Sequence, residues 1–569
     1  MATVTRIGGA AVFRSLRQRV ISRAALYFVL VFLLFLGVEV GLQWISGAYS
    51  SEFDDPDEPA HYVTGLMIRD YLAARAPAPP LAYAENYYLH YPKVSFGLWP
   101  PFLHMVEAGW MLVFSESRTS ILLLMALLPA LVAVTLYRVI RSEFSRLAGL
   151  AAGLLWLCQP VVLAYSGRVM GDTLVALLDF WAVLCFGRFL DTEKWRDAVL
   201  FGLLASLSII SKGNGMALVF VPPLAVLLCR RFHLIKTRAF WYPALIVLMI
   251  AGPWQYLSAR LLAGIGYRQA SLEIAGTYLY KTLTFLGFGL LPFVVVGVIA
   301  RVVAPFPRKA VEGRWAALAA LPVGVWALHA ILPSAGVEPR YMIPTIPPLV
   351  MFFTAGVAWV SARVPLRGWP ALRKAALLTG LLAPVFAAES FRIPQRSYYG
   401  FAEAAQSLVG RPEFRNSVFL VSAQGAGEGM FISEVAMRER RPGHVILRAS
   451  KVLSQSDWDG ERYELLYRDP QETMKYLESI PVQVLVLDAR PSARRRAHHE
   501  NLLKMLEMYP DRWKLFGVYP QRRPATASPG GVRVYRLVGQ GVKPTGKIRI
   551  PLKYTLRKTI EREIGEIPQ

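Results

Sequence analysis

The sequence is poor in cysteine and in acidic residues. Its 3 cysteines in 569 residues are too few for a disulfide framework, and Cys158, Cys185 and Cys229 all fall within apolar runs. Asp and Glu together number 39 against 63 Lys and Arg, which gives a formal net charge of +24. These cations lie mostly in short loops between apolar runs, as the positive-inside rule expects, so the charge does not indicate nucleic-acid binding. The sequence also has no ligand spacing typical of a dedicated metal site.

Apolar residues, in contrast, make up 54% of the chain. Runs long enough to cross the roughly 30 Å hydrocarbon core of a bilayer recur down to about residue 391, and a more polar region follows. The first run, residues 25–44, comes after an arginine-rich stretch and has no small-residue cleavage site. We therefore expect a retained helix with a cytoplasmic N-terminus rather than a cleaved signal peptide.

The basic loops set the predicted topology. Lys and Arg cluster near residues 138–146, 188–196, 230–238, 301–314 and 363–374, and two crossings fit between consecutive clusters if all of them are cytoplasmic. The apolar stretch 102–114, which contains His104 and Glu107, is too short to span, so we expect a helix on the outer interface. The pattern predicts a polytopic α-helical membrane protein with about eleven transmembrane helices, at residues 25–44, 118–138, 147–164, 173–190, 197–211, 214–229, 239–258, 281–300, 315–332, 342–361 and 374–391.

This topology collects charged and aromatic side chains on the outer face. The first outer loop, residues 45–117, contains "DDPDEPAHY" and the aromatic-rich "ENYYLHYPKVSFGLWPP". An ionisable group inside the hydrocarbon would cost about 2.5–3.5 kcal/mol, so Asp172 and Lys212 are expected at the interface or in a functional site. The set predicts a cavity for a substrate with a lipid tail and an anionic, sugar-like head. The other outer loops contribute Arg168, Asp172, Lys212, Tyr267, Arg268, Glu338, Arg340 and Tyr341.

Each of these features alone also has a structural explanation. Asp55 can cap a helix whose first residue is Pro56, and Asp172 can cap a helix that begins at Thr173. Lys212 can be a snorkelling helix-end residue, and the aromatic residues can form an interfacial belt. Their coincidence on one face of the membrane favours a site.

The motifs on this face resemble those of the C-superfamily (GT-C) membrane glycosyltransferases. The likeness covers roughly residues 20–391 and is strongest to the bacterial branch with the aminoarabinose–lipid A transferases and the protein O-mannosyltransferase-like enzymes. Relatives in the aminoarabinose branch often carry a Lys directly before the Pro-Pro pair, where this chain has Trp99. The motifs are "PDEPAHY", "WPPFLHMVEAGWMLVF", "SGRVMGD", "SIISKGNG" and "EPRYMIPTIPPL".

The resemblance implies a GT-C fold and transfer of a sugar from a polyprenyl-phosphate-linked donor on the outer face of a bacterial inner membrane. Displacing polyprenyl phosphate passes through an oxocarbenium-like state, and a carboxylate is needed to take the acceptor proton. Cations must hold the charge that grows on the phosphate, for which the guanidinium fork is well suited. Inversion follows if transfer is a single displacement.

The resemblance, taken with these requirements, implies the candidate residues. Asp57 is the expected catalytic base, with Glu58 and Asp172 orienting the acceptor or modulating Asp57. Lys93 is a candidate substitute for the lysine that relatives carry at the position of Trp99. A divalent metal ion could also occupy the acid cluster. The expected donor-phosphate contacts are Arg340, Tyr341, Lys212, Arg168, Arg268 and Lys93, and the expected acceptor or sugar contacts are His61, Tyr62, Tyr87 and Tyr88.

The region after residue 391 changes in pattern. "NSVFLVSA", "HVILRA", "VQVLVLDA", "WKLFGVYP" and "VRVYRLV" predict strands, and residues 427–440, 471–480 and 493–509 predict helices. The alternation predicts an extracytoplasmic α/β domain over residues 392–540 with a largely parallel sheet, followed by a basic tail, residues 541–569. Gly425, Gly427 and Gly429 favour a tight turn or an acceptor-binding loop over a cofactor site.

Two other functions compete with glycosyl transfer. A transporter or flippase for a lipid-linked sugar should place charges near the bilayer midplane and show internal repeats, and neither is evident. A structural or assembly protein would leave the carboxylates of the outer face unexplained. The acceptor stays open, since lipid, glycan and protein acceptors all fit an open outer cavity.

Overall fold

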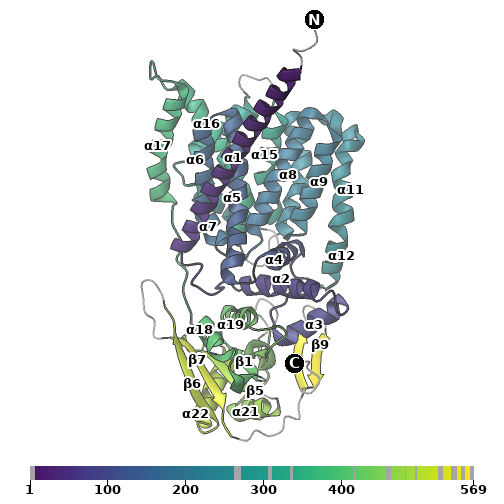
Figure 1. Ribbon diagram of the computed structural model, residues 1–569, viewed down its shortest axis with the longest axis vertical. Helices are drawn as coiled ribbons and strands as arrows, with labels where there is room; N and C mark the ends of the chain where they lie inside the picture. The colour runs from purple at the N-terminus through teal and green to yellow at the C-terminus, as the bar shows by residue number, and fades with distance from the viewer. Residues whose placement is uncertain are drawn as a thin grey trace.

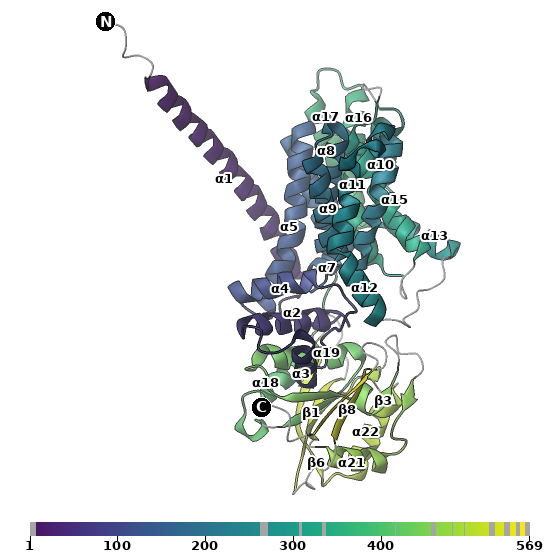
Figure 2. The same cartoon turned by 90° about the vertical axis from the view of Figure 1, so that its right-hand side faces the viewer.

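The helices of the first 391 residues form a bundle, and the C-terminal domain lies beyond one end of it (Figures 1 and 2). The computed structural model describes residues 7–261, 271–305, 310–332, 337–415, 417–456, 463–480, 482–493, 496–522, 530–539, 547–552 and 558–563. The bundle contains α1 (Ile7–Ile45), α5 (Arg118–Glu143), α6 (Arg146–Leu157), α7 (Pro160–Ser166), α8 (Asp172–Thr192), α9 (Trp195–Ile209), α10 (Val221–Cys229), α11 (Arg238–Ile250), α12 (Gly252–Leu261), α13 (Leu272–Leu286), α14 (Leu291–Val298), α15 (Gly313–Ile331), α16 (Ile346–Arg363) and α17 (Ala371–Glu389).

Among the described residues, six helices are long and apolar enough to cross a membrane, or up to eight if each of two bent pairs is one span. The predicted count of eleven is therefore not confirmed, because several apolar runs form shorter or broken helices. The run 147–164 bends by 64° where Pro160 opens α7, since proline cannot continue the hydrogen-bond ladder of α6. The run 281–300 is interrupted at Gly287, which has a φ of 78°, and α13 and α14 meet there at 105°.

The first outer loop folds into three helices at the end of the bundle, α2 (Glu58–Ala73), α3 (Pro80–His90) and α4 (Phe102–Val113). The helices α2 and α4 pack against each other and lie between the bundle and the C-terminal domain (Figures 1 and 2). The sequence predicted α4 as a helix too short to span, and the helix has 12 residues.

The C-terminal domain is built on a mixed five-stranded sheet in the order β2-β1-β5-β7-β6. Strand β1 is parallel to β2 and β5, whereas β7 is antiparallel to β5 and β6. The prediction of a largely parallel sheet is therefore wrong for the pairs that β7 makes. The reason is that only the ten residues 521–530 separate β6 from β7, fewer than the dozen or more that a parallel crossover requires. The bounds are β1 (Val418–Ser422), β2 (Val445–Arg448), β5 (Val482–Asp488), β6 (Trp513–Pro520), β7 (Gly531–Leu537), α18 (Phe401–Leu408), α19 (Gly425–Arg438), α20 (Ala449–Val452), α21 (Pro470–Ser479) and α22 (Ala497–Met508).

Two short antiparallel pairs complete the described strands. Strands β3 (Ser454–Gln455) and β4 (Glu464–Leu465) pair with each other. Strands β8 (Lys547–Leu552) and β9 (Lys558–Glu563) form a second pair inside the basic tail, where the sequence showed no periodicity.

Polar contacts join the C-terminal domain to the first outer loop. The carboxylate of Glu52 accepts hydrogen bonds from the backbone N–H groups of Tyr399, Gly400 and Ala402, at 2.8, 2.9 and 3.2 Å, where α18 begins. A carboxylate at a helix N-terminus is stabilising, so this contact fixes the domain against the site described below.

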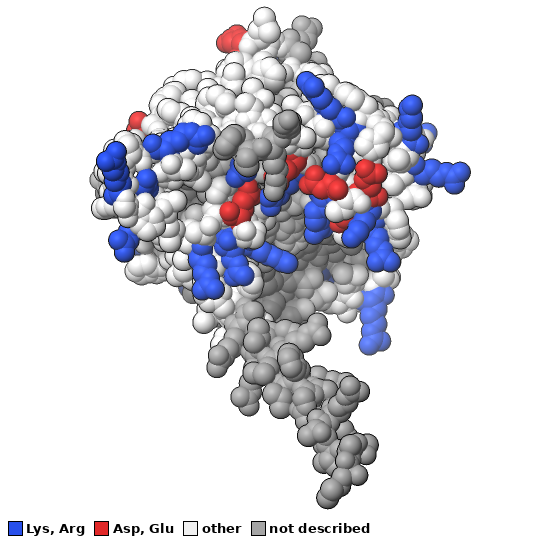
Figure 3. Space-filling view, turned by 90° about the horizontal axis from the view of Figure 1, so that it is seen from above, with Lys and Arg blue, Asp and Glu red and all other residues white. Residues whose placement is uncertain are grey.

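The opposite end of the bundle is rich in Lys and Arg. Figure 3 looks onto that end and shows cations around its rim. Among them, Arg141 lies in the last turn of α5 and Arg363 in the last turn of α16. Lys and Arg gathered in the short loops at one end of a bundle are the asymmetry that the positive-inside rule describes.

Candidate active site

The acidic stretch of the first outer loop lies at the start of α2. The helix begins at Glu58 with Asp57 at the N-cap, which corrects the prediction that Asp55 caps a helix starting at Pro56. The Asp57 side chain makes no capping hydrogen bond, and the backbone N–H of Asp57 donates to Asp55 Oδ1 at 3.0 Å. The carboxylate of the N-cap residue is therefore free to point elsewhere.

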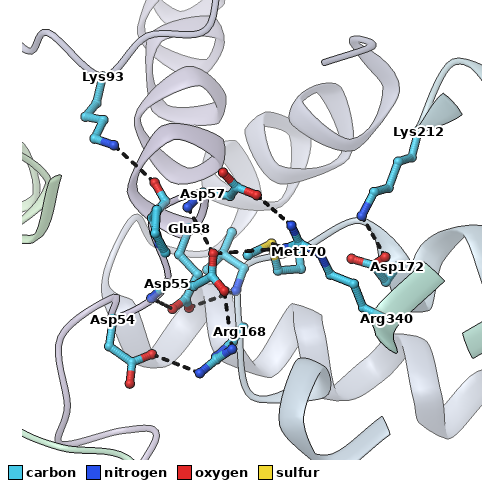
Figure 4. A network of polar contacts seen from close by, with 12 residues as sticks. Asp54, Asp55, Asp57, Glu58, Lys93, Arg168, Met170, Asp172, Lys212 and Arg340 are labelled. Atoms are coloured by element: carbon cyan, nitrogen blue, oxygen red, sulfur yellow. Dashed lines mark hydrogen bonds and ion pairs between the residues drawn. The ribbon is translucent and has the colours of Figure 1, made fainter. Parts of the chain in front are cut away.

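Asp57 pairs with Arg340, which lies in the 3₁₀ segment Pro339–Thr345 ahead of α16. Arg340 Nη2 is 2.9 Å from Asp57 Oδ2, and Arg340 Nη1 is 3.4 Å from Met170 Sδ (Figure 4). The Asp57 side chain is 29% exposed, against 12% for Asp54, 16% for Asp55 and 0% for Glu58. Of the four carboxylates, Asp57 is thus the one best placed to meet a substrate.

Glu58 holds the frame of the site. Its Oε1 accepts from the backbone N–H of Val169 at 3.0 Å, and its Oε2 accepts from Arg396 Nη2 at 2.7 Å and from Asp55 N at 3.2 Å. Burial raises the pKa of Glu58, and the charge of Arg396 opposes that rise. With both oxygens committed to the protein, Glu58 can orient the neighbouring groups but has no accessible oxygen for an acceptor.

Arg396 was missed by the sequence analysis. It lies in the segment between α17 and α18, and its Nη2 is 2.9 Å from Asp54 Oδ1 as well as 2.7 Å from Glu58 Oε2. Its Nη1 donates to the carbonyl of Gly167, and its backbone N–H donates to the carbonyl of Ser46. Nothing in its local sequence distinguishes it from Arg392, the other arginine of the segment.

Asp172 and Lys212 form the other half of the polar network. Lys212 Nζ is 2.6 Å from Asp172 Oδ1, and Asp172 is the first residue of α8, one position earlier than predicted. The Lys212 ammonium also lies 5.0 Å from the ring centroid of Tyr341, and the Arg340 guanidinium lies 5.7 Å from the same ring. Figure 4 shows Lys212 and Asp172 beyond Arg340 as seen from Asp57. The structure therefore brings together four of the residues that were predicted to hold the donor or to assist Asp57, namely Asp172, Lys212, Arg340 and Tyr341.

The remaining predicted phosphate contacts differ in position. Arg168 pairs with Asp54 and Asp55, at 3.4 and 3.3 Å. Arg268 lies outside the described residues. Lys93 is half-buried, and its Nζ donates to the carbonyl of Pro56 at 3.1 Å, on the side of Asp57 away from Lys212 (Figure 4). Burial, reinforced by the nearby guanidinium of Arg448, lowers the pKa of Lys93 to about 7.

The residues predicted to contact the acceptor or the sugar mostly bond to or pack against other protein side chains and backbone groups. His61 Nδ1 is 3.0 Å from His104 Nε2, and burial lowers the pKa of His61 well below its usual value, so the ring is neutral. The Tyr62 hydroxyl donates to the Glu116 carbonyl at 2.6 Å. Tyr62, Tyr87 and Tyr88 are buried and do not join the acid cluster. The Tyr87 hydroxyl donates to Asp70 Oδ2 at 3.0 Å, and Tyr88 packs against Phe96, both within the first outer loop.

The glycine-rich stretch after β1 is helical rather than a separate turn, since Gly425 is the first residue of α19. A search of the described residues for three or more His, Cys, Asp or Glu side chains able to share a metal ion finds none. The divalent ion that the acid cluster could hold stays a prediction.

Comparisons with known proteins agree with this architecture. Residues 99–256 match the family model described as dolichyl-phosphate-mannose-protein mannosyltransferase. No curated protein matches the chain. The crystal structure of ArnT from Cupriavidus metallidurans bound to undecaprenyl phosphate is 13% identical, with a TM-score of 0.55, over 89% of this chain and 98% of that one. The apo structure of the same ArnT is 15% identical, with a TM-score of 0.55, over 90% and 98%. The chain is thus a polytopic helical membrane protein with the fold of the C-superfamily glycosyltransferases, as its sequence motifs predicted.

Proposed function

We propose that the protein is an integral-membrane glycosyltransferase that moves a sugar from a polyprenyl-phosphate donor to an acceptor on the outer face of the membrane. The observation that carries the proposal is the contact between Asp57, the most exposed carboxylate of the acidic stretch, and Arg340, whose neighbours include Lys212. A base and two cations able to bind phosphate therefore meet at one end of an apolar bundle. The matched family and the undecaprenyl phosphate named for ArnT support the same donor class.

In this mechanism Asp57 accepts the proton of an acceptor hydroxyl or amine as the nucleophile attacks the anomeric carbon. The bond between that carbon and the phosphate oxygen breaks, and its electron pair stays on the phosphate. Arg340 and Lys212 hold the charge that develops on the leaving phosphate, so no strong general acid is required. A single displacement of this kind inverts the anomeric centre.

The orientation follows from the charges. The basic end of the bundle (Figure 3) is assigned to the cytoplasm, which leaves the C-terminal domain on the periplasmic or extracellular side of a bacterial inner membrane. The donor, the lipid, glycan or protein acceptor, and the surrounding membrane lipids are the partners of this reaction.

The proposal is tested with purified full-length protein and two assays, binding of undecaprenyl phosphate and transfer of label from a sugar-labelled polyprenyl phosphate to membrane acceptors. Asp57→Asn should keep binding but lower transfer by about 10²–10⁴-fold, the usual contribution of a positioned base. Wild-type protein that neither binds undecaprenyl phosphate nor transfers label contradicts the function. An active Asp57→Asn variant contradicts the assignment of the base, and label that crosses the bilayer unchanged supports a flippase.

A further inference from the structure

Lys93 lies apart from Arg340 and Lys212, the cations proposed to bind the donor phosphate (Figure 4). Figure 4 shows Lys93 on one side of Asp57, with Arg340, Lys212 and Asp172 on the other. Lys93 Nζ donates to the carbonyl of Pro56, the residue before Asp57, at 3.1 Å. Arg340, in contrast, contacts the carboxylate of Asp57 itself, at 2.9 Å. The proposed base Asp57 thus lies between two groups of cations, with Lys93 on one side and Arg340 and Lys212 on the other.

The two sides must have different tasks if the proposed function holds. In a single displacement, the nucleophile and the leaving group occupy opposite faces of the anomeric carbon. When the leaving phosphate lies with Arg340 and Lys212, the acceptor approaches from the face turned away from them. Lys93 is on that face, so it cannot serve the leaving phosphate as the sequence analysis expected.

The C-terminal domain contacts Lys93 through α19. Gly429, in the second turn of α19, lies so close that an added Cβ would be 2.7 Å from Lys93 Cε and 2.9 Å from Pro59 Cγ. Arg448 and Glu428, two ionisable residues of the domain near Lys93, form an ion pair in which Arg448 Nε is 2.8 Å from Glu428 Oε2. The acceptor side is therefore made jointly by the first outer loop and α19.

The Lys93 ammonium keeps hydrogen-bonding capacity for a ligand. It has three N–H donors, and within the described part of the chain Pro56 is its one hydrogen-bond partner. Lys93 is half-buried and not fully enclosed, which leaves part of its side chain open to solvent. An ammonium in this position suits an oxygen atom of the acceptor, near the nucleophilic group that gives its proton to Asp57.

We propose that Lys93, held by α19 of the C-terminal domain, is an acceptor-binding residue and not a donor-phosphate ligand. In the balanced step, the acceptor O–H or N–H proton passes to Asp57 and the acceptor atom bonds to the anomeric carbon. The carbon–oxygen bond to phosphate breaks, with its electron pair left on the phosphate. Lys93 holds a second acceptor atom throughout and exchanges no proton. This inference rests on the proposed glycosyl transfer.

The test compares Lys93→Met with Lys212→Met in the purified full-length protein, with undecaprenyl phosphate as the binding probe. Lys212→Met should weaken binding about tenfold or more, the scale of one charge-assisted hydrogen bond, whereas Lys93→Met should stay within about twofold of wild type. Transfer from sugar-labelled polyprenyl phosphate to membrane acceptors should nevertheless fall about tenfold in Lys93→Met. Retained binding also shows that this variant is folded.

A matched pair of variants in α19 tests the role of the C-terminal domain. Gly429→Ala would place a Cβ 2.7 Å from Lys93 Cε and 2.9 Å from Pro59 Cγ, so the flexible Lys93 side chain is expected to move. Transfer should then fall without a change in undecaprenyl phosphate binding. Gly425→Ala, in the same helix, meets no atom within 4 Å and should leave both unchanged.

The outcomes separate the two hypotheses. If Lys93→Met weakens binding as much as Lys212→Met, Lys93 is a donor ligand, and the inference fails while the proposed function stands. Unchanged transfer in Lys93→Met, or in Gly429→Ala, also overturns the inference. If the wild-type protein neither binds undecaprenyl phosphate nor transfers label, the proposed function itself fails.

Discussion

Arg396 and Glu58 form a buried ion pair that ties the C-terminal region to the start of α2. Arg396 Nη2 is 2.7 Å from Glu58 Oε2, and the side chains are 6% and 0% exposed. The two residues are 338 positions apart in the sequence. Because Asp57 precedes Glu58, the pair also fixes the helix start that presents the proposed base.

Removal of Arg396 should destabilise the protein strongly. Arg396→Ala leaves the buried Glu58 carboxylate without its cation, which typically costs about 3–5 kcal/mol. A lower unfolding temperature of the detergent-purified protein should report this loss. Adding Glu58→Gln to the variant should restore part of the stability, because the amide removes the uncompensated charge.

Arg392→Ala is the matched control for this experiment. Arg392 is exposed, and within the described part of the chain its guanidinium bonds only to nearby backbone carbonyls, those of Ala387, Ala388 and Phe391. Its removal should change stability little, as for most surface substitutions. Equal losses in Arg392→Ala and Arg396→Ala would show that the buried pair does not hold the junction.

The sequence predicted the residues of the site better than their connections. Asp172, Lys212 and Arg340 each border an apolar run, and Asp57 lies in the loop between the first two runs, so topology alone places all four on one face. Arg396 could not be found, because its role depends on pairing across hundreds of residues and not on a local pattern.

The aromatic residues show a second limit. The composition of the first outer loop suggested that Tyr62, Tyr87 and Tyr88 face a cavity, yet their side chains are buried. An aromatic residue at an interface suits a wet cavity and a packed core equally, and only the tertiary structure decides between them. The helix count is not confirmed for a related reason, since length and hydropathy do not reveal bends such as the one at Gly287.

The contact between α2 and α4 should be sensitive to small volume changes. A Cβ at Gly65 would lie 2.4 Å from Glu107 Oε2 and 2.9 Å from Glu107 Cβ, and the Glu107 side chain is fully buried. Gly65→Ala should therefore lower stability by about 1–3 kcal/mol, the usual cost of overpacking, in a thermal unfolding experiment. Gly109→Ala, on α4, meets nothing within 4 Å and should not destabilise, so a loss of similar size there would argue against the packing explanation.

The chemistry of Glu107 gives a further test of the same contact. Burial raises the pKa of Glu107 well above its usual value, which favours the neutral carboxyl. Glu107→Gln keeps the shape and the neutral state, and should leave the unfolding temperature near that of wild type. A large loss of stability in Glu107→Gln would mean that the carboxylate is charged in the folded protein.

The last prediction concerns the pH dependence that Lys93 gives to acceptor use. Its pKa is lowered to about 7 by burial and by Arg448 and Lys451, while Asp57 and Glu428 oppose the shift. A lysine with a lowered pKa is cationic below that pH and neutral above it. The acceptor kcat/KM, which reports the free enzyme, should therefore fall as the pH rises from about 6 to about 8.5. Lys93→Arg keeps its charge over this range and should remove the fall, although its different shape can lower the rate at every pH. A wild-type decline that persists unchanged in Lys93→Arg would assign it to another group and remove Lys93 from the acceptor site.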